Sequence, residues 1–185
     1  MSNEKPILFG GSMVRAILDG RKTQTRRVVK PQPPDGAEYD TDGTSVVYHA
    51  SGRNISDYSC PHPTGTYMWV RETYGLSAPD NVTRRTVYRA DGEQALPTKW
   101  RSSIFMPRRV SRITLLVTGV RVQRVREITE ADAIAEGVGG RCVFARLWDS
   151  INAKRGYGWN TNPLVWAYTF ERVERWGRHE RVYTI

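Results

Sequence analysis

The most informative segment of the chain is residues 12–27, Ser-Met-Val-Arg-Ala-Ile-Leu-Asp-Gly-Arg-Lys-Thr-Gln-Thr-Arg-Arg. Its first half carries apolar residues at helical spacing, for example Met13 and Ile17, so we expect a short helix over residues 12–19. Gly20 follows as the signal that ends this helix. The second half gathers four cations around two threonine hydroxyls. A basic, hydroxyl-bearing segment directly after a helix is the first candidate in the chain for a binding or catalytic site.

The composition is that of a basic, folded protein. The chain has 185 residues, 39% of them hydrophobic, which suits one domain and excludes a disordered or fibrous protein. Lys and Arg total 28 against 19 Asp and Glu, giving a net charge of +9, and 23 of the 28 cations are arginine. Arginine binds phosphates and base edges through a planar fork. The bias therefore favours a nucleic-acid partner, with GC-rich codon usage as the alternative explanation.

Residues 31–66 differ in character from the rest of the chain. They contain five of the ten prolines, four glycines, five acidic residues and one arginine, for a net charge of −4. The other 149 residues must then carry +13. We therefore expect a single domain over residues 1–185 with an inserted, mostly irregular acidic segment at 31–66, in which residues 45–49 form one small strand.

The remaining pattern mixes strands with short helices. β-branched and aromatic runs predict strands, a Thr129 cap and an apolar repeat around Trp148 predict helices, and the two kinds of element do not alternate strictly. This favours an α+β fold with a small mixed or antiparallel β-barrel and short flanking helices. The expected strands are 67–71, 86–89, 111–125 and 164–173, and the expected helices are 129–137 and 143–154.

The termini and cysteines indicate a cytoplasmic protein. The first apolar run, residues 7–9, is shorter than the ~7–15 residues of a signal-peptide core, and no stretch approaches the ~18 apolar residues of a membrane helix. Cys60 and Cys142 are too few for a disulfide scaffold. Cys60 and His62 lack a second ligand pair at zinc spacing, so we expect no metal and no cofactor.

Four sequence elements follow one another in a recognisable order: Gly20-Arg-Lys-Thr-Gln-Thr-Arg26 after its helix, Trp69-Val-Arg-Glu72, the Ile128 to Gly137 helix, and the Trp148 helix that leads to the last strand. With these elements the chain resembles the larger, phage-type members of the ASCH family of PUA-like domains. The resemblance covers most of the chain except residues 31–66 and the tail after about residue 174. It implies a small β-barrel with flanking helices and a cleft that holds RNA or a nucleoside.

The resemblance also implies a catalytic activity. Some small bacterial proteins that resemble this chain are amidohydrolases that remove the acetyl group from N4-acetylcytidine with a lysine, a threonine and a glutamate. By motif position, these residues would be Lys22, Thr25 and Glu136. The present chain is longer than those proteins, and its 31–66 segment could cover or extend the cleft.

The residues themselves are compatible with amide hydrolysis. A lysine made less basic by burial and by Arg21 and Arg26 could act as a base toward the Thr25 hydroxyl or toward a water molecule. Glu136 could then protonate the leaving amine. In a straight strand, positions 22 and 25 face opposite ways, so their joint action requires a turn or bulge. The alternative for Lys22 and Thr25 is an exposed basic turn without a catalytic role, and the alternative for Glu136 is an exposed acid at a helix end.

Further residues are expected to contact the substrate or a nucleic acid. The arginines are phosphate contacts or solvated charges, and the segment around Trp100 either stacks on a base or fills one end of the barrel. Trp159 lies in a glycine-rich loop and is the candidate for a base-stacking lid. Arg71 and Glu72 could form an ion pair at the cleft mouth. The full set is Arg21, Thr23, Arg26, Arg27, Arg71, Glu72, Trp100, Arg108, Arg109 and Trp159.

Other functions use the same features. A non-catalytic reader would recognise a flipped or single-stranded base in the cleft, with arginines on the backbone. A ribonuclease would need a 2′-hydroxyl activated near Lys22. An unrelated interaction domain would account for the chain if the arginine bias only reflects codon usage. The expected partners are RNA, single-stranded nucleic acid or a modified nucleoside, and the oligomeric state is left open.

Overall fold

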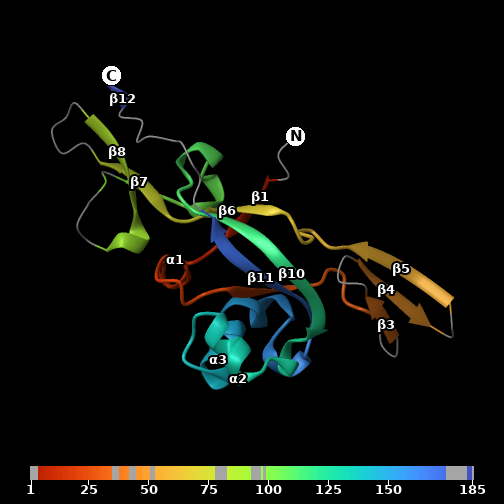
Figure 1. The fold of residues 1–185 in the computed structure, drawn as a ribbon. Helices are drawn as coiled ribbons and strands as arrows, with labels where there is room; N and C mark the ends of the chain where they lie inside the picture. Colours follow the sequence, from red (N-terminus) through yellow and green to blue (C-terminus); the bar gives the residue numbers. More distant parts are fainter. Residues whose placement is uncertain are drawn as a thin grey trace. The chain divides into compact units, whose positions relative to one another are not determined.

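The chain forms two compact units. Unit 1 comprises residues 1–20, 67–116 and 172–185, and unit 2 comprises residues 21–66 and 117–171. The computed structural model (Figure 1) describes residues 4–34, 38–41, 45–50, 53–77, 83–92, 97, 99–173 and 183–184. The predicted single domain over residues 1–185 stays a prediction, and the two units are described in turn.

Unit 1 is built on two groups of strands. β1 (Glu4–Leu8) runs parallel to β6 (Tyr67–Arg71), and the first residues of β10 (Thr114–Arg124) run antiparallel to β6. A second sheet has the strand order β12-β8-β7-β9. Its strands are β7 (Tyr74–Ser77), β8 (Thr83–Tyr88), β9 (Trp100–Arg101) and β12 (Tyr183–Thr184). The connections contain the 3-10 turns η1 (Arg89–Asp91), η2 (Ser103–Phe105) and η3 (Arg108–Val110).

Helix α1 (Gly11–Leu18) confirms the helix predicted over residues 12–19. Val14 and Ile17 are buried on its apolar face, as the helical spacing requires. Gly20 has a φ of +72°, the left-handed conformation in which helices commonly end and which glycine adopts without steric cost. The glycine therefore ends the helix, as predicted, and the basic segment begins one residue later.

The prediction that residues 31–66 are mostly irregular is wrong. The segment contains three antiparallel strands, which lie side by side in Figure 1: β3 (Glu38–Thr41), β4 (Ser45–Ala50) and β5 (Arg53–Ser59). β4 includes the small strand predicted over 45–49. Val46 and Tyr48 alternate on its buried side, and the Tyr48 hydroxyl donates to the Pro31 carbonyl at 2.9 Å. Burial of every second side chain is the pattern of a strand in a sheet, and the many prolines and glycines of residues 31–66 obscured it in the sequence.

Unit 2 packs its helices on a common apolar core. β2 (Gln24–Val28) is antiparallel to β11 (Leu164–Val173), and β10 continues into this unit. The helices are α2 (Glu130–Ala135) and α3 (Arg141–Asn152), with turns η4 (Val125–Glu127), η5 (Ala153–Arg155) and η6 (Trp159–Thr161). The core side chains are Val125, Ile128, Ala133, Phe144, Trp148 and Val165. No described helix is long and apolar enough to cross a membrane.

The fold is a mixed α+β arrangement of sheets with short helices. Five strands are hydrogen-bonded in the order β1-β6-β10-β11-β2, with one parallel pair, β1 and β6. This order is open, because its two end strands are different strands that each pair on one side only. Among the strands that the structure describes, the predicted closed barrel is therefore absent, while the predicted α+β class and its short helices are present.

Candidate functional site

The candidate site in unit 2 forms where the start of β2 meets the end of α2. Lys22 and Glu136 form an isolated antiparallel bridge, and the Thr23 backbone N–H donates to the Ala135 carbonyl at 2.8 Å. Thr129 caps α2 by accepting a hydrogen bond from the Asp132 N–H at 3.1 Å, as the sequence predicts. Backbone pairing and the cap together fix the position of Glu136 beside Lys22.

Lys22 is buried, and its ammonium group is surrounded by hydrogen-bond acceptors of the protein. Its side chain is 1% exposed, and its ammonium nitrogen lies 2.6 Å from Glu136 Oε2. It also donates to the Glu136 carbonyl at 2.8 Å and to the Gln24 carbonyl at 2.7 Å. An ammonium has three donors. These three acceptors can therefore satisfy the charged form of Lys22 completely.

Arg26 binds the other oxygen of the same glutamate. Its Nη1 lies 3.1 Å from Glu136 Oε1, and its Nη2 lies 3.0 Å from Asp132 Oδ2. Arg121 reaches Asp132 at 2.6 Å from the side of β10. Two carboxylates on one helix face thus hold three cations, and we call Lys22, Arg26, Arg121, Asp132 and Glu136 the β2–α2 charge cluster.

Burial and neighbouring charges set the protonation of this cluster. Burial lowers the pKa of Lys22, and the positive charges of Arg27 and Arg26 lower it further, while the ion pair with Glu136 opposes the shift. Burial alone would raise the pKa of Asp132, but the hydrogen bond from Arg121 and the charge of Arg26 lower it overall. Because the pKa of Lys22 is lowered and its nitrogen contacts a carboxylate, a proton can move between Lys22 and Glu136.

Thr25 lies on the other face of β2. Successive side chains of a strand point to opposite faces, so Thr25 faces away from Arg26 and the carboxylates that bind Arg26. Thr25 is 2% exposed, and its partner across the sheet is Tyr168 on β11. The structure brings Lys22 and Glu136 together in one group of contacts and places Thr25 with Tyr168 instead.

The face that Thr25 shares with Tyr168 holds a second group of polar side chains. Cys60 Sγ lies 3.7 Å from the Tyr168 hydroxyl, and the His62 ring packs edge-on against the Tyr168 ring at 5.6 Å between centroids. Burial raises the pKa of Tyr168, and the nearby Arg27 opposes this. Within the described part of the chain, no three His, Cys, Asp or Glu side chains are grouped so that they could hold a metal ion.

The other residues singled out in unit 2 are distributed around the cluster. Arg21 and Thr23 are exposed, and Arg27 is partly buried opposite Trp166. Arg26, interpreted from sequence as a phosphate contact or a solvated charge, is instead 3% exposed and bound to two carboxylates. Trp159 is partly buried against the core, and its ring centroid lies 6.2 Å from that of Phe144. The Arg141 guanidinium lies 5.8 Å from the centroid of the Trp159 ring. Trp159 is thus part of the core packing as well as accessible to solvent.

Five of the predicted binding residues belong to unit 1. The sequence-based prediction that Glu72 pairs with Arg71 is wrong. Glu72 Oε1 accepts instead from Arg112 Nε at 2.9 Å. Arg71 instead lies over the Trp69 ring at 4.8 Å, and Arg108 binds Glu4 at 2.8 Å. The reason is that successive side chains of a strand point to opposite faces, so the charged groups of residues 71 and 72 at the end of β6 point apart. Trp100 is partly buried in β9, and Arg109 is exposed in η3.

Sequence reasoning missed Asp132 and Arg121, which complete the cluster. Asp132 lies four residues before Glu136, and this spacing puts both carboxylates on one face of the predicted helix. That spacing is a signal that the sequence contains. Arg121 has no comparable signal, because its position beside Asp132 depends on how β10 lies against the helix.

Comparisons with known proteins leave the function open. No family model matches the chain, and no curated protein matches it. Among solved structures, the chain is similar to protein EF3133 from Enterococcus faecalis V583, described as family-model DUF984, at 15% sequence identity and a TM-score of 0.45. This likeness covers 94% of the present chain and 84% of the other. Agreement at this level carries no functional conclusion, so the function is argued from the site geometry.

Proposed function

We propose that unit 2 binds RNA or a modified nucleoside and hydrolyses an amide on the base, with N4-acetylcytidine as the model substrate. The observation that carries the proposal is the buried contact of 2.6 Å between Lys22 and Glu136, together with the lowered pKa of that lysine. The sequence resemblance to ASCH proteins, with the nucleoside cleft that it implies, supports the same substrate class. The cytoplasmic location and phage-type relationship belong to the proposal as well.

The chemistry follows from one proton shared within the pair. When that proton is on Glu136, Lys22 is a neutral amine and takes a proton from the attacking nucleophile, which forms a bond to the amide carbonyl carbon. Glu136 then gives its proton to the leaving amine as the carbon–nitrogen bond breaks. The pair ends as an ammonium and a carboxylate, and proton transfer across their hydrogen bond restores the starting state.

Arg26 supplies the charge that the transition state requires. Its Nε is buried and has no hydrogen-bond partner among the described residues, although the same guanidinium binds both carboxylates. A buried donor without a partner is costly unless a ligand satisfies it. An amide oxygen that gains negative charge during attack is the acceptor that such a donor stabilises best.

Water is the nucleophile that the strand geometry favours. Both Thr25 and a water molecule fit the sequence pattern, but Thr25 faces away from Arg26 in β2. In the proposed reaction Lys22 therefore activates water, and Thr25 positions the strand through its buried side chain. A Thr25→Val variant retains hydrolysis under this proposal and loses it if the Thr25 hydroxyl is the nucleophile.

The test is direct turnover of N4-acetylcytidine by the purified chain, followed by chromatography of the released cytidine. Lys22→Arg keeps the positive charge but cannot give up a proton near neutral pH, and Glu136→Gln keeps the shape of the side chain. Both variants should lose at least ~100-fold in rate, within the usual ~10²–10⁴-fold contribution of general acid–base catalysis. Lys154→Arg, an exposed lysine on η5, is the matched control.

Two outcomes would overturn this proposal. One is the absence of turnover by a wild-type chain with a cooperative unfolding transition. The other is full activity in a folded Lys22→Arg variant. Circular dichroism and thermal unfolding of every variant separate loss of chemistry from loss of structure.

A second candidate, a reader that binds a modified base without catalysis, is favoured by one observation. All three donors of the Lys22 ammonium have acceptors, so the charged form is stable in the arrangement described. A lysine held this way cannot act as a base until a substrate disturbs its contacts. For a reader, the logarithm of the binding constant for a short acetylated RNA falls linearly with the logarithm of the salt concentration, while the RNA stays chemically unchanged.

A further inference from the structure

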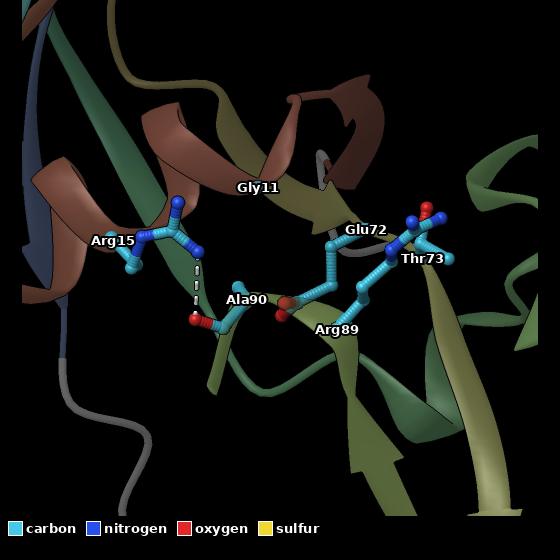
Figure 2. A pocket seen from close by; sticks show the side chains of 6 residues that line it. All are labelled: Gly11, Arg15, Glu72, Thr73, Arg89 and Ala90. Carbon is cyan, nitrogen blue, oxygen red and sulfur yellow. Dashed lines mark hydrogen bonds between the residues drawn. The ribbon is translucent and has the colours of Figure 1, made fainter. Parts of the chain in front are cut away.

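The pocket of unit 1 holds a buried carboxylate between its two cationic sides. Figure 2 shows the Glu72 side chain between Arg15 and Arg89, and all three residues line the pocket. Both Glu72 oxygens accept hydrogen bonds from Arg112, at 2.9 and 3.1 Å. The carboxylate therefore lies where an anion would have to bind, and this pocket is no site for an anion.

Helix α3 in unit 2 is rotated away from its own hydrophobic pattern. Phe144, Leu147, Trp148 and Ile151 repeat at i, i+3, i+4 and i+7, which is the spacing of a single buried face. The structure buries Phe144, Trp148 and the polar Asn152 instead. Ile151, the residue before Asn152, is 51% exposed. Since isoleucine is more often buried than asparagine, the core of unit 2 uses only part of the apolar surface of α3.

Three apolar side chains form a ridge on the exposed side of this helix. Val143, Leu147 and Ile151 are four residues apart, so they follow one another along one side of α3, and we call them the α3 ridge. Val143 is 46% exposed and Leu147 is partly buried. The ridge extends over about 12 Å of helix and lies about 100° around the axis from the buried Phe144 and Trp148. Single exposed apolar residues are common, but a continuous row of them indicates an interaction surface.

The border of the ridge is positively charged. Residues 141–155 contain four cations and one acidic residue, Asp149. Asp149 Oδ1 accepts a hydrogen bond from the backbone N–H of Trp159 at 2.6 Å, whereas Arg146 and Arg155 are exposed, each about one turn from an end of the ridge. A second copy of the chain would bring the same arginines to this surface, and like charges oppose such an interface. Carboxylates of a different protein would be attracted.

We propose that the α3 ridge is the docking surface for an acidic amphipathic helix of a partner protein. Side chains four residues apart form the kind of ridge that packs into the groove between the same rows of another helix, at an interaxial angle of about 50°. Apolar side chains of the partner pack against the ridge, and carboxylates on its flanks pair with Arg146 and Arg155.

The buried side of α3 presents the ridge in a fixed position. Phe144 and Trp148 belong to the core of unit 2, and the Trp148 indole N–H donates to the Tyr157 carbonyl at 2.8 Å. The Asn152 side chain donates to the Trp148 carbonyl at 3.2 Å. A partner helix would therefore meet a surface that is already ordered, which reduces the entropic cost of binding.

The probe is a synthetic peptide of about 20 residues, long enough to be helical by itself. It carries leucines at helical spacing on one face and glutamates beside them. Its fluorescein-labelled form is titrated with the full chain, and binding is followed by fluorescence anisotropy. Two control peptides replace every glutamate by lysine or every leucine by serine. We expect the acidic peptide to bind and each control peptide to bind at least ~10-fold more weakly.

The apolar contribution is tested with Val143→Gln and Ile151→Gln. Both variants replace an exposed side chain by a residue of good helix propensity, so both should fold, which circular dichroism checks. Each should weaken binding of the acidic peptide at least ~5-fold through lost apolar contact. Ile104→Gln, at an isoleucine of η2 that is 53% exposed, is the matched control and should leave binding unchanged.

The charged border is tested with the double variant Arg146→Ala with Arg155→Ala. It should weaken binding of the acidic peptide at least ~5-fold at low salt and have little effect at high salt, because salt screens exposed charges. The control is Arg85→Ala with Arg101→Ala, which removes two exposed arginines from unit 1.

Four results would overturn the proposal. They are no binding of the acidic peptide with the chain at millimolar concentration, equal affinity for the acidic and the lysine peptide, unchanged binding to folded Val143→Gln and Ile151→Gln variants, and unchanged binding to the double arginine variant at low salt. Two other occupants are tested directly. A dimer in sedimentation equilibrium that Ile151→Gln disrupts would assign the ridge to a second copy. Binding to phosphatidylserine vesicles that Ile151→Gln disrupts would assign it to a membrane surface, and either result also overturns the proposal.

The inference goes beyond the proposed hydrolysis and does not depend on it. Peptide binding is measured without a nucleoside, and the variants that test it lie outside the β2–α2 charge cluster. A chain that binds the acidic peptide without hydrolysing N4-acetylcytidine would contradict the proposed hydrolase alone.

Discussion

Two buried glutamates, one in each unit, are neutralised in different ways. Glu136 in unit 2 lies between Lys22 and Arg26, which are as deeply buried as the glutamate itself. Glu72 in unit 1 is held by Arg112, which also binds the exposed Asp91, and it lines a pocket. Burying several charges together makes their removal costly and lets a proton move between them, whereas water can replace part of what a partly exposed partner such as Arg112 provides. Loss of an ion-pair partner should therefore cost more stability in unit 2 than in unit 1.

The largest effect is expected for Glu136→Ala. This change leaves Lys22 without its carboxylate partner and Arg26 with Asp132 alone. Breaking a buried ion pair from one side costs ~3–5 kcal/mol, and we expect this loss in the free energy of unfolding, measured with urea. The double variant Lys22→Met with Glu136→Leu removes both charges and should recover much of it. A loss below ~1 kcal/mol in the single variant would contradict the buried placement of Glu136.

Arg112→Ala should destabilise the protein by about 2 kcal/mol at pH 7. The effect is smaller because the Arg112 side chain is 25% exposed, so water replaces part of what it provides to Glu72. Burial already raises the pKa of Glu72, and loss of Arg112 raises it further. The folded state then binds the extra proton more readily, so the cost should shrink as the pH falls from 7 toward 5. Unfolding measured at both pH values tests this, and a cost that grows on acidification would refute it.

Thr129→Ala should cost about 1 kcal/mol. The Thr129 hydroxyl accepts the N–H of Asp132 at the start of α2, and loss of such a cap typically costs this amount. Because the same helix carries Asp132 and Glu136, the variant also tests whether the cap supports the charge cluster. Chemical unfolding provides the measurement, with Thr64→Ala, an exposed turn residue outside any helix or strand, as the control. Equal stability of the two variants would show that the cap adds nothing.

The smallest effect near neutral pH is expected for Tyr88→Phe, and it changes with pH. The Tyr88 hydroxyl donates to the Val110 carbonyl at 2.8 Å, and burial raises its pKa to about 12. Between the unperturbed value near 10 and this value, the unfolded state releases the proton first, so wild-type stability falls as the pH rises from 10 to 12. Phenylalanine has no proton to lose, so the variant should lose less stability over that range. Parallel curves for the two proteins would contradict the raised pKa, and Tyr67→Phe, at an exposed tyrosine, is the control.

Local features of the fold could be predicted from the sequence, and long-range ones could not. Helix α1, its Gly20 end and the Thr129 cap follow from spacing and capping rules that act within a few residues. The β3-β4-β5 sheet was missed because proline and glycine dominate the composition of 31–66 while only Val46 and Tyr48 show the buried alternation. The barrel was expected from element content, which does not determine how the outermost strands pair.

The same division holds for the two sites. Lys22 and Glu136 could be named from motif position, but their contact joins residues 114 apart and depends on backbone pairing between β2 and the end of α2. Arg112 was not predicted as the partner of Glu72, because the ion pair bridges 40 residues and leaves no local pattern. The opposite placement of Thr25 and Arg26 follows from strand alternation, but only once β2 is known to be a strand.

The amino-acid sequence alone determined helix α1 and its end at Gly20, the Thr129 cap, the strong positive charge and the segment that carries Lys22. Each of these depends on composition or on interactions between residues close in the chain. The tertiary structure decided which carboxylates meet which cations, that Arg26 is buried rather than exposed, and that a pocket opens between Arg15 and Arg89. Ion pairing and pocket formation depend on distances of a few ångströms between residues far apart in sequence, and only the packing of the chain sets those distances.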